Sequence, residues 1–367
     1  MIGGDLLKRD QISARQLRAI LFAGLLTPAI QVLPGATAAV AGEAAWLTGP
    51  LLFLPMAALA WLCAALVRGE QGGLSAALQT AFGRGLGRAV SLLYMIWAVF
   101  LITVEGRLYA ERLLEAGYRS APPVVFTAIL LGILLWVGRK KLGAFARAAE
   151  ICCLALGLVL ALVLLFSILD VSPSYVLPVW LSDLPAAALA TLRPAAALSC
   201  GAYAAALAGR VERREGDRRR GAAWLLAGCA VLGLLQFGIL GQLGPGLSSR
   251  MDVPFFEVAR GVGVQGAFQR VEAVVMAAWI FSDFALLGLL LFAVREMAGE
   301  AFGPKWERRA VPWAVVLAFL GALLLFPDDL SAKDAAAGIL LWGNAALGFL
   351  VPGLALLCKN VKRKRRG

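Results

Sequence analysis

Asp283 is the residue of this sequence best placed to do chemistry, because it lies in the middle of a long apolar stretch. A carboxylate at the centre of a bilayer costs about 2.5–3.5 kcal/mol on insertion scales, so Asp283 must face the interior of a helix bundle and find a partner there. With Ser282 beside it, Asp283 can hold an ammonium group, a metal cation or a proton. The alternative is a structural hydrogen bond between Asp283 and another helix.

A second apolar stretch contains two prolines at positions that a membrane helix must accommodate. Pro28 and Pro34 have no backbone N–H, so each removes a hydrogen bond from the ladder of a helix. Backbone groups left unsatisfied at membrane depth are tolerated only where they line a cavity or are buried in protein. The residues expected at such an opening are Thr27, Pro28, Ala29 and Ile30.

A third apolar stretch carries Ser199, Cys200 and Gly201 near its middle, after Pro194. Small polar residues and glycine allow a helix to open at this point. If both helices open at matching positions of two repeats, the freed N–H groups bind a carboxylate and the freed carbonyls face an ammonium group or a cation. The alternative is that prolines and glycines are simply common in membrane helices.

Aromatic and charged residues near these stretches are candidates for the walls and the gate of a ligand site. Tyr203, Trp279 and Val99 can form its walls, although packing between helices is the commoner role of such side chains. Charges at the outer ends of two helices can form a salt-bridge gate above the site, and the alternative is that they extend to the lipid headgroups. The predicted gate residues are Glu105, Arg270 and Glu272.

These residues need a membrane protein to position them. Of the 367 residues 60% are hydrophobic and 16% are charged, which is more apolar surface than one soluble core can bury. A helix that spans the hydrocarbon core needs about 20 residues. We find ten such stretches, which run over residues 16–40, 47–67, 88–113, 122–138, 146–169, 184–207, 222–243, 271–293, 310–327 and 335–358.

The distribution of lysine and arginine gives the orientation of the chain. With the N-terminus inside, 27 of the 35 basic residues fall on the inner side, as the positive-inside rule requires. Both ends are therefore expected to be cytoplasmic, with the basic tail 359–367 against anionic lipid headgroups. Short helices are predicted in the inner loop 72–87 and in the outer loop 245–270.

Several classes of protein are disfavoured. The sequence has no histidine, and its six cysteines lack the spacing of metal ligands. It contains no phosphate-binding loop, no catalytic triad and no zinc motif. The net charge of +12 does not indicate nucleic-acid binding, because most of the basic residues fall on the predicted inner side, where membrane proteins carry them. We therefore expect neither an enzyme nor a cofactor.

Four segments, in their order and spacing, resemble the spore germination permease family. The start of the chain matches the family's opening Ile-Ser-x-x-Gln, and the outer loop before span 8 matches its Pro-Phe-x-Glu and later Arg-x-Glu pattern. The matching positions are Ile12, Ser13 and Gln16; Pro34, Gly42 and Trp46; residues 175–179; and residues 254–257 with Phe268, Arg270, Glu272 and Trp279.

The resemblance implies the fold of the amino acid–polyamine–organocation superfamily. This is an all-α membrane protein of about ten helices in a 5+5 inverted repeat, LeuT-like, with helices 1 and 6 broken. The chain is then a single transmembrane domain over 1–367. It divides into an inner segment 1–15, a first repeat 16–169, a second repeat 184–358 and the basic tail 359–367.

The resemblance also implies a function. Members of the family are the B subunits of nutrient germinant receptors, so we expect a small germinant, an amino acid, to bind at the broken helices. Partner A and C subunits in the inner membrane of a bacterial spore would receive the signal. A proton- or sodium-coupled amino acid permease fits the same fold, with Asp283 as the coupling site. A structural subunit whose pocket binds nothing is the third hypothesis, since Thr27-Pro28 and Cys200-Gly201 depart from the family's pattern.

Overall fold

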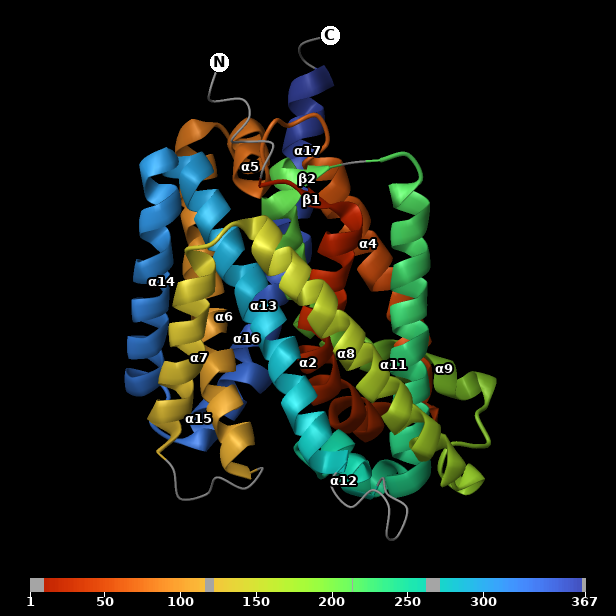
Figure 1. Cartoon of the computed structure of the whole chain (residues 1–367). Helices are drawn as coiled ribbons and strands as arrows, with labels where there is room; N and C mark the ends of the chain where they lie inside the picture. Colours follow the sequence, from red (N-terminus) through yellow and green to blue (C-terminus); the bar gives the residue numbers. More distant parts are fainter. Residues whose placement is uncertain (1–9, 116–121, 213, 262–270, 365–367) are drawn as a thin grey trace.

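The computed structural model describes residues 10–115, 122–212, 214–261 and 271–364, and these form an all-helical bundle with one short pair of strands. Helix α2 begins and helix α17 ends at the same end of the bundle (Figure 1). Among the described residues, six helical stretches are long and apolar enough to cross a membrane, and the first of them contains the first two predicted spans. The predicted all-α membrane protein is confirmed.

Each of the ten predicted spans falls on helical structure. The first five correspond to α2 (Ala14–Ala41), α3 and α4 (Thr48–Leu51, Phe53–Leu66), α6 (Arg84–Glu115), α7 (Pro123–Gly138) and α8 (Leu142–Leu169). The sixth consists of α9 (Leu184–Ala190), α10 (Leu192–Leu198) and the 3-10 helix η4 (Ser199–Arg210). The last four are α11 (Asp217–Ser248), α13 (Val271–Phe302), α14 (Pro304–Leu324) and the run α15, α16, η5 and α17 (Asp329–Ala337, Ile339–Ala345, Ala346–Leu350, Val351–Lys364).

Helix α13 forms the centre of the bundle, between α2, α6, α8 and α14 (Figure 1). Its residues 285–294 are all almost completely buried, which is typical of a helix that is apolar on every side. Helix α2 approaches it closely at Gly24, where an added Cβ would lie 3.0 Å from the Cα of Leu286. This close approach brings the Thr27–Pro28 segment of α2 beside Ser282 and Asp283 of α13.

The opening Ile-Ser-x-x-Gln pattern has a physical explanation. Ser13 and Gln16 form a capping box at the start of α2, in which each side chain accepts a hydrogen bond from the other's backbone N–H, at 3.2 Å and 3.0 Å. Ile12 is buried, and strand β1 (Ile12–Ser13) pairs in parallel with β2 (Val211–Glu212). The beginning of α2 is therefore connected directly to the end of η4, the last part of the sixth predicted span.

Both predicted loop helices exist. Helix α12 (Pro254–Gly261) lies in the loop 245–270, and α5 (Leu74–Phe82) lies in the loop 72–87. Helix α5 buries Leu74, Ala77 and Leu78 against the bundle, so protein covers its apolar face. The carboxylate of Glu300, near the end of α13, accepts hydrogen bonds from the backbone N–H groups of Gly73 and Ala76 and thus caps α5.

Replacing Glu300 with Ala is expected to lower the free energy of unfolding by about 1 kcal/mol, because N–H groups at the start of α5 lose their acceptor. In a chain of this size the melting temperature should fall by about 2 °C, measured by thermal unfolding in detergent. Glu257→Ala is the matched control, since Glu257 makes an exposed ion pair with Arg260 that contributes little. Equal losses in the two variants would contradict a capping role for Glu300.

Candidate functional site

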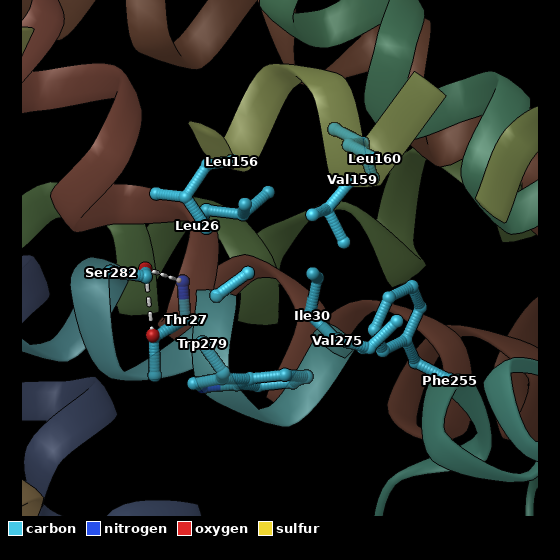
Figure 2. Close-up of a pocket in the computed structure, with 11 residues that line it drawn as sticks. Leu26, Thr27, Ile30, Leu156, Val159, Leu160, Phe255, Val275, Trp279 and Ser282 are labelled. Atoms are coloured by element: carbon cyan, nitrogen blue, oxygen red, sulfur yellow. Dashed lines mark hydrogen bonds between the residues drawn. The ribbon is translucent and has the colours of Figure 1, made fainter. Parts of the chain in front are cut away.

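The hydroxyl of Ser282 inserts into the backbone of α2 beside Pro28. It donates to the carbonyl of Ala23 at 2.6 Å. It accepts from the N–H of Thr27 at 2.9 Å (Figure 2). These are the two groups that an undisturbed helix joins through its own ladder. Helix α2 is otherwise continuous from Ala14 to Ala41. The predicted break in the first span is therefore absent: α2 continues through Pro28 as one helix, and the Ser282 side chain bonds to two backbone groups next to the proline.

The sixth predicted span changes from α-helix to 3-10 helix where the sequence predicts an opening. The α-helix α10 ends at Leu198 and continues as the 3-10 helix η4 from Ser199. A stretch of 3-10 helix in the middle of a span often marks a hinge. The hydroxyl of Ser199 donates to the carbonyl of Ala196 at 2.7 Å, and Gly348 packs directly against Ser199. Ser199 therefore stabilises the point at which the helix type changes.

Asp283 has a buried partner on α6, the third predicted span. The Nη2 of Arg112 lies 2.7 Å from Oδ2 of Asp283, and both side chains are almost fully buried. The hydroxyl of Thr27 donates to the other carboxylate oxygen at 2.9 Å. The guanidinium of Arg112 also lies 5.8 Å from the centre of the Trp279 ring. Asp283 thus joins α2, α6 and α13 through one ion pair and one hydrogen bond.

A cavity lies on one side of α2, between helices α2, α6, α10, α13, α15 and α16 and the start of η4. The space open to the centres of water-sized spheres is about 40 Å³, which has room for about three water molecules or a small solute of that size. Apolar side chains form most of its surface. Its polar lining comes from the amides of Gln31 and Asn344, the thiol of Cys200 and the carboxylate of Glu105. We call this space the central cavity.

Glu105 is the one charged side chain in the lining of the central cavity. It is 8% exposed, and among the described residues its Oε2 has no hydrogen-bond partner. A buried carboxylate oxygen without a partner is costly, and a ligand that donates hydrogen bonds and carries positive charge removes that cost. The central cavity is therefore suited to an ammonium group.

The structure separates the predicted site residues into three groups. Pro28, Cys200 and Glu105 line the central cavity. Thr27, Ile30, Trp279 and Ser282 line a second cavity on another side of α2, and Asp283 lies beside both Thr27 and Ser282. Besides Asp283, the described predicted residues that line neither cavity are Ala29, Val99, Ser199, Gly201 and Tyr203.

Tyr203 has a structural place in the bundle core. Its hydroxyl donates to the backbone carbonyl of Tyr94 at 2.8 Å, and the two rings meet edge to face. Gly201 faces Leu25 of α2, with an added Cβ only 3.1 Å from its side chain. The two residues thus connect η4 to α6 and to α2.

Only part of the predicted gate lies among the residues that the structure describes. Arg270 lies outside the described residues, and the side chain of Glu272 does too. Glu105 and its neighbour Arg107 do not extend to the headgroups. Both are buried in the protein, where Arg107 pairs with Glu111 and donates to the carbonyl of Phe326 at 3.0 Å. Glu105 thus lies in the wall of the central cavity.

Sequence reasoning missed three residues that shape the site. Gln31 and Asn344 bring amides to the central cavity, and Asn344 is held by the indole N–H of Trp97 at 2.9 Å. Arg112 supplies the partner of Asp283. The available signal was their polarity within apolar spans, because a polar residue in a membrane helix faces the bundle interior by default.

This arrangement of helices, with a small cavity between the predicted spans 1, 3, 6, 8 and 10, defines a membrane protein of the LeuT-like transporter fold. The crystal structure of MhsT in complex with L-phenylalanine superposes with a TM-score of 0.62 at 17% identity, covering 95% of this chain and 98% of MhsT. A Na⁺-coupled sialic acid symporter in a substrate-bound outward-open state superposes with a TM-score of 0.70 at 12% identity, covering 96% of this chain and 80% of the symporter. At these identities the likeness establishes the fold.

The chain belongs to the spore germination protein family, whose family model matches residues 11–328. A search of curated proteins gave no match. The resemblance read from the sequence is therefore confirmed, and the protein is a multi-pass membrane protein of the permease type.

Proposed function

We propose that this protein senses a small germinant that carries an ammonium group, most simply an amino acid, in its central cavity. Glu105 supports the proposal. It is a buried carboxylate in the cavity wall, and among the described residues its Oε2 has no hydrogen-bond partner. The neighbouring ion pair of Arg112 and Asp283 is neutral as a unit, so Glu105, when it is ionised, gives the region one negative charge. A ligand cation compensates that charge in surroundings of low dielectric constant.

Binding must shift the protein between two conformations to transmit a signal, and a ligand does so only if it binds one of them better. The moving parts we infer are the segment of α2 around Pro28 and the 3-10 helix η4, since each contributes to the cavity wall. Strands β1 and β2 connect the beginning of one to the end of the other. A change at the cavity would therefore reach the inner face, where the termini are cytoplasmic in this proposal.

The proposed setting is the inner membrane of a bacterial spore, with A and C germinant receptor subunits as partners. The two five-helix segments, 16–169 and 184–358, act as the repeats of one transmembrane domain in this proposal. No enzymatic step is assigned to the protein.

A coupled amino acid permease is the second candidate. One structural neighbour is a Na⁺-coupled symporter, and the fold suits transport equally well. The ion pair with Arg112 disfavours this candidate, because Asp283, the predicted coupling site, already has a cationic partner.

The deciding experiment uses purified protein in proteoliposomes. Binding of labelled amino acids is measured first, followed by uptake of the same compounds under an imposed proton or sodium gradient. Saturable binding without uptake is the expected result. Gradient-driven accumulation that an ionophore abolishes would make the protein a permease. The absence of saturable binding to any member of the panel would favour a structural subunit.

A further inference from the structure

The wall of the central cavity provides Glu105 for the ammonium group of an amino acid, but it provides no cation for the carboxylate. Among the described residues that line this cavity there is no lysine or arginine, so a hydrogen-bond donor must bind the carboxylate. A carboxylate that enters without finding a donor loses its hydration without compensation. Besides the thiol of Cys200, the side-chain donors in the wall are the carboxamides of Gln31 and Asn344.

The carboxamide of Asn344 is held in one orientation by Trp97. The indole nitrogen of Trp97 lies 2.9 Å from Oδ1 of Asn344. Because an indole N–H can only donate, the atom that it meets must be the carbonyl oxygen of the carboxamide, and the NH₂ group lies on the other side. Its nitrogen Nδ2 is 3.4 Å from the carbonyl oxygen of Ala197, which is longer than an ordinary hydrogen bond.

The NH₂ group of Asn344 can therefore donate to a further acceptor. It carries two hydrogens, and the long contact with Ala197 engages at most one of them. Asn344 and Ala197 both line the central cavity, so the contact between them lies along its wall. A ligand carboxylate can accept from the NH₂ group there, and such a charge-assisted hydrogen bond is shorter and stronger than the contact with Ala197.

Helix α6 fixes the position of Asn344 from both directions along the chain. The ring of Trp97 fills the space beside Gly343, where an added Cβ would overlap it, so glycine at this position allows the ring to reach Asn344. After Asn344 the helix forms the π-helical turn η5, a rare geometry that is frequent at functional sites. Within this turn the carbonyl of Leu347 accepts a hydrogen bond from the hydroxyl of Tyr94.

Gln31 is the competing donor in the wall of the central cavity. Within the described residues the structure shows no hydrogen bond that orients its carboxamide. A ligand would have to immobilise this side chain on binding, and that loss of freedom opposes binding. The carboxamide of Asn344 is ordered before the ligand arrives, which makes it the better donor.

We infer that Asn344 recognises the carboxylate of the ligand and that Trp97 is its positioning residue. The NH₂ group of Asn344 donates to the carboxylate while Glu105 binds the ammonium group. This inference rests on the function proposed above for the same cavity. It also narrows the ligand class, because a space of about 40 Å³ restricts the ligand to the smallest amino acids, such as glycine.

The test compares two probes on the full-length protein in nanodiscs. Glycine carries both charged groups, and methylamine is glycine with its carboxylate replaced by hydrogen. Saturation-transfer difference NMR gives the dissociation constant of each probe. We expect Asn344→Leu to weaken the binding of glycine by about tenfold or more, since a hydrogen bond to a charged group is lost. The same variant should bind methylamine as the wild type does.

Trp97→Phe tests the positioning role. It keeps an aromatic ring beside Gly343 and removes the N–H that orients the carboxamide, so glycine should bind about threefold more weakly or worse, with methylamine unchanged. A purely structural role of Trp97 would change both probes alike. The matched control is Asn360→Leu, which replaces an exposed asparagine of α17 and should change neither constant. Binding of methylamine verifies that each variant keeps the cavity, and Asn344→Ala replaces Asn344→Leu if that variant loses it.

Three results would overturn the inference and leave the proposed function standing. The first is unchanged binding of glycine in Asn344→Leu, and the second is a wild type that binds methylamine but not glycine. The third is a selective loss of glycine binding in Gln31→Leu that Asn344→Leu does not share, which would assign the carboxylate to Gln31. A wild type that binds neither probe would contradict the proposed function, and the inference would fail with it.

Discussion

Replacing Arg112 with Met is expected to lower the free energy of unfolding by about 3–5 kcal/mol, because it leaves Asp283 buried and charged without its partner. Asp283 is 2% exposed, and after the change only the hydroxyl of Thr27 would bind its carboxylate. Thermal unfolding in one detergent measures the effect. The matched control is Arg260→Met, which removes an exposed partner of Glu257 and should change stability by less than about 1 kcal/mol.

A double variant separates the charge effect from the loss of packing. Arg112→Met combined with Asp283→Leu removes both charges, so most of the lost stability should return. The coupling energy from the complete mutant cycle then measures the ion pair. Equal melting temperatures for Arg112→Met and Arg260→Met would show that the buried pair has no special role.

The same variants distinguish the two interpretations of Asp283. If Asp283 is structural, the double variant should bind ligand with nearly the wild-type affinity once it is folded. If Asp283 binds the ligand or a coupling ion, binding should be lost even when stability is restored. The 2.7 Å contact with Arg112 leads us to expect the first result.

Replacing Glu105 with Gln is expected to weaken binding of an amino acid ligand by about 30-fold or more. A buried charge that pairs directly with a ligand typically contributes 2–5 kcal/mol when its partner is present, and about 1.4 kcal/mol corresponds to tenfold in affinity. Glutamine keeps the size of the side chain, so the cavity itself should persist. The dissociation constant of the best ligand from the proteoliposome panel is the measured quantity.

Two controls bear on this prediction. Glu257→Gln removes an exposed carboxylate outside the cavity and should leave the affinity unchanged. An uncharged analogue of the ligand, which lacks the ammonium group, should bind Glu105→Gln and the wild type alike. If Glu105→Gln retained full affinity for the charged ligand, the ammonium group would have to bind elsewhere.

Much of the fold could be predicted because bilayer physics acts on local sequence. A spanning helix must satisfy its own backbone and expose apolar side chains, so length and hydrophobicity identify it without knowledge of its neighbours. The change of helix type at Ser199 was predicted for a similar reason, since small polar residues act on their own backbone, whereas the break predicted at Pro28 did not form. The capping of α2 by Ser13 and Gln16 is equally local, but it was not predicted and only the structure revealed it.

The sequence by itself therefore determined the helical spans, the position where the sixth span changes its geometry, and the family. Only the tertiary structure decided which side chains meet. Arg112 and Asp283 are 171 positions apart in the chain, and Thr27 and Ser282 are 255 apart. Such pairs depend on how α2, α6 and α13 rotate and cross, which no local pattern encodes. For the same reason Glu105, expected at a gate, lies in the central cavity, and the division of the predicted site between two cavities appears only when the helices are packed together.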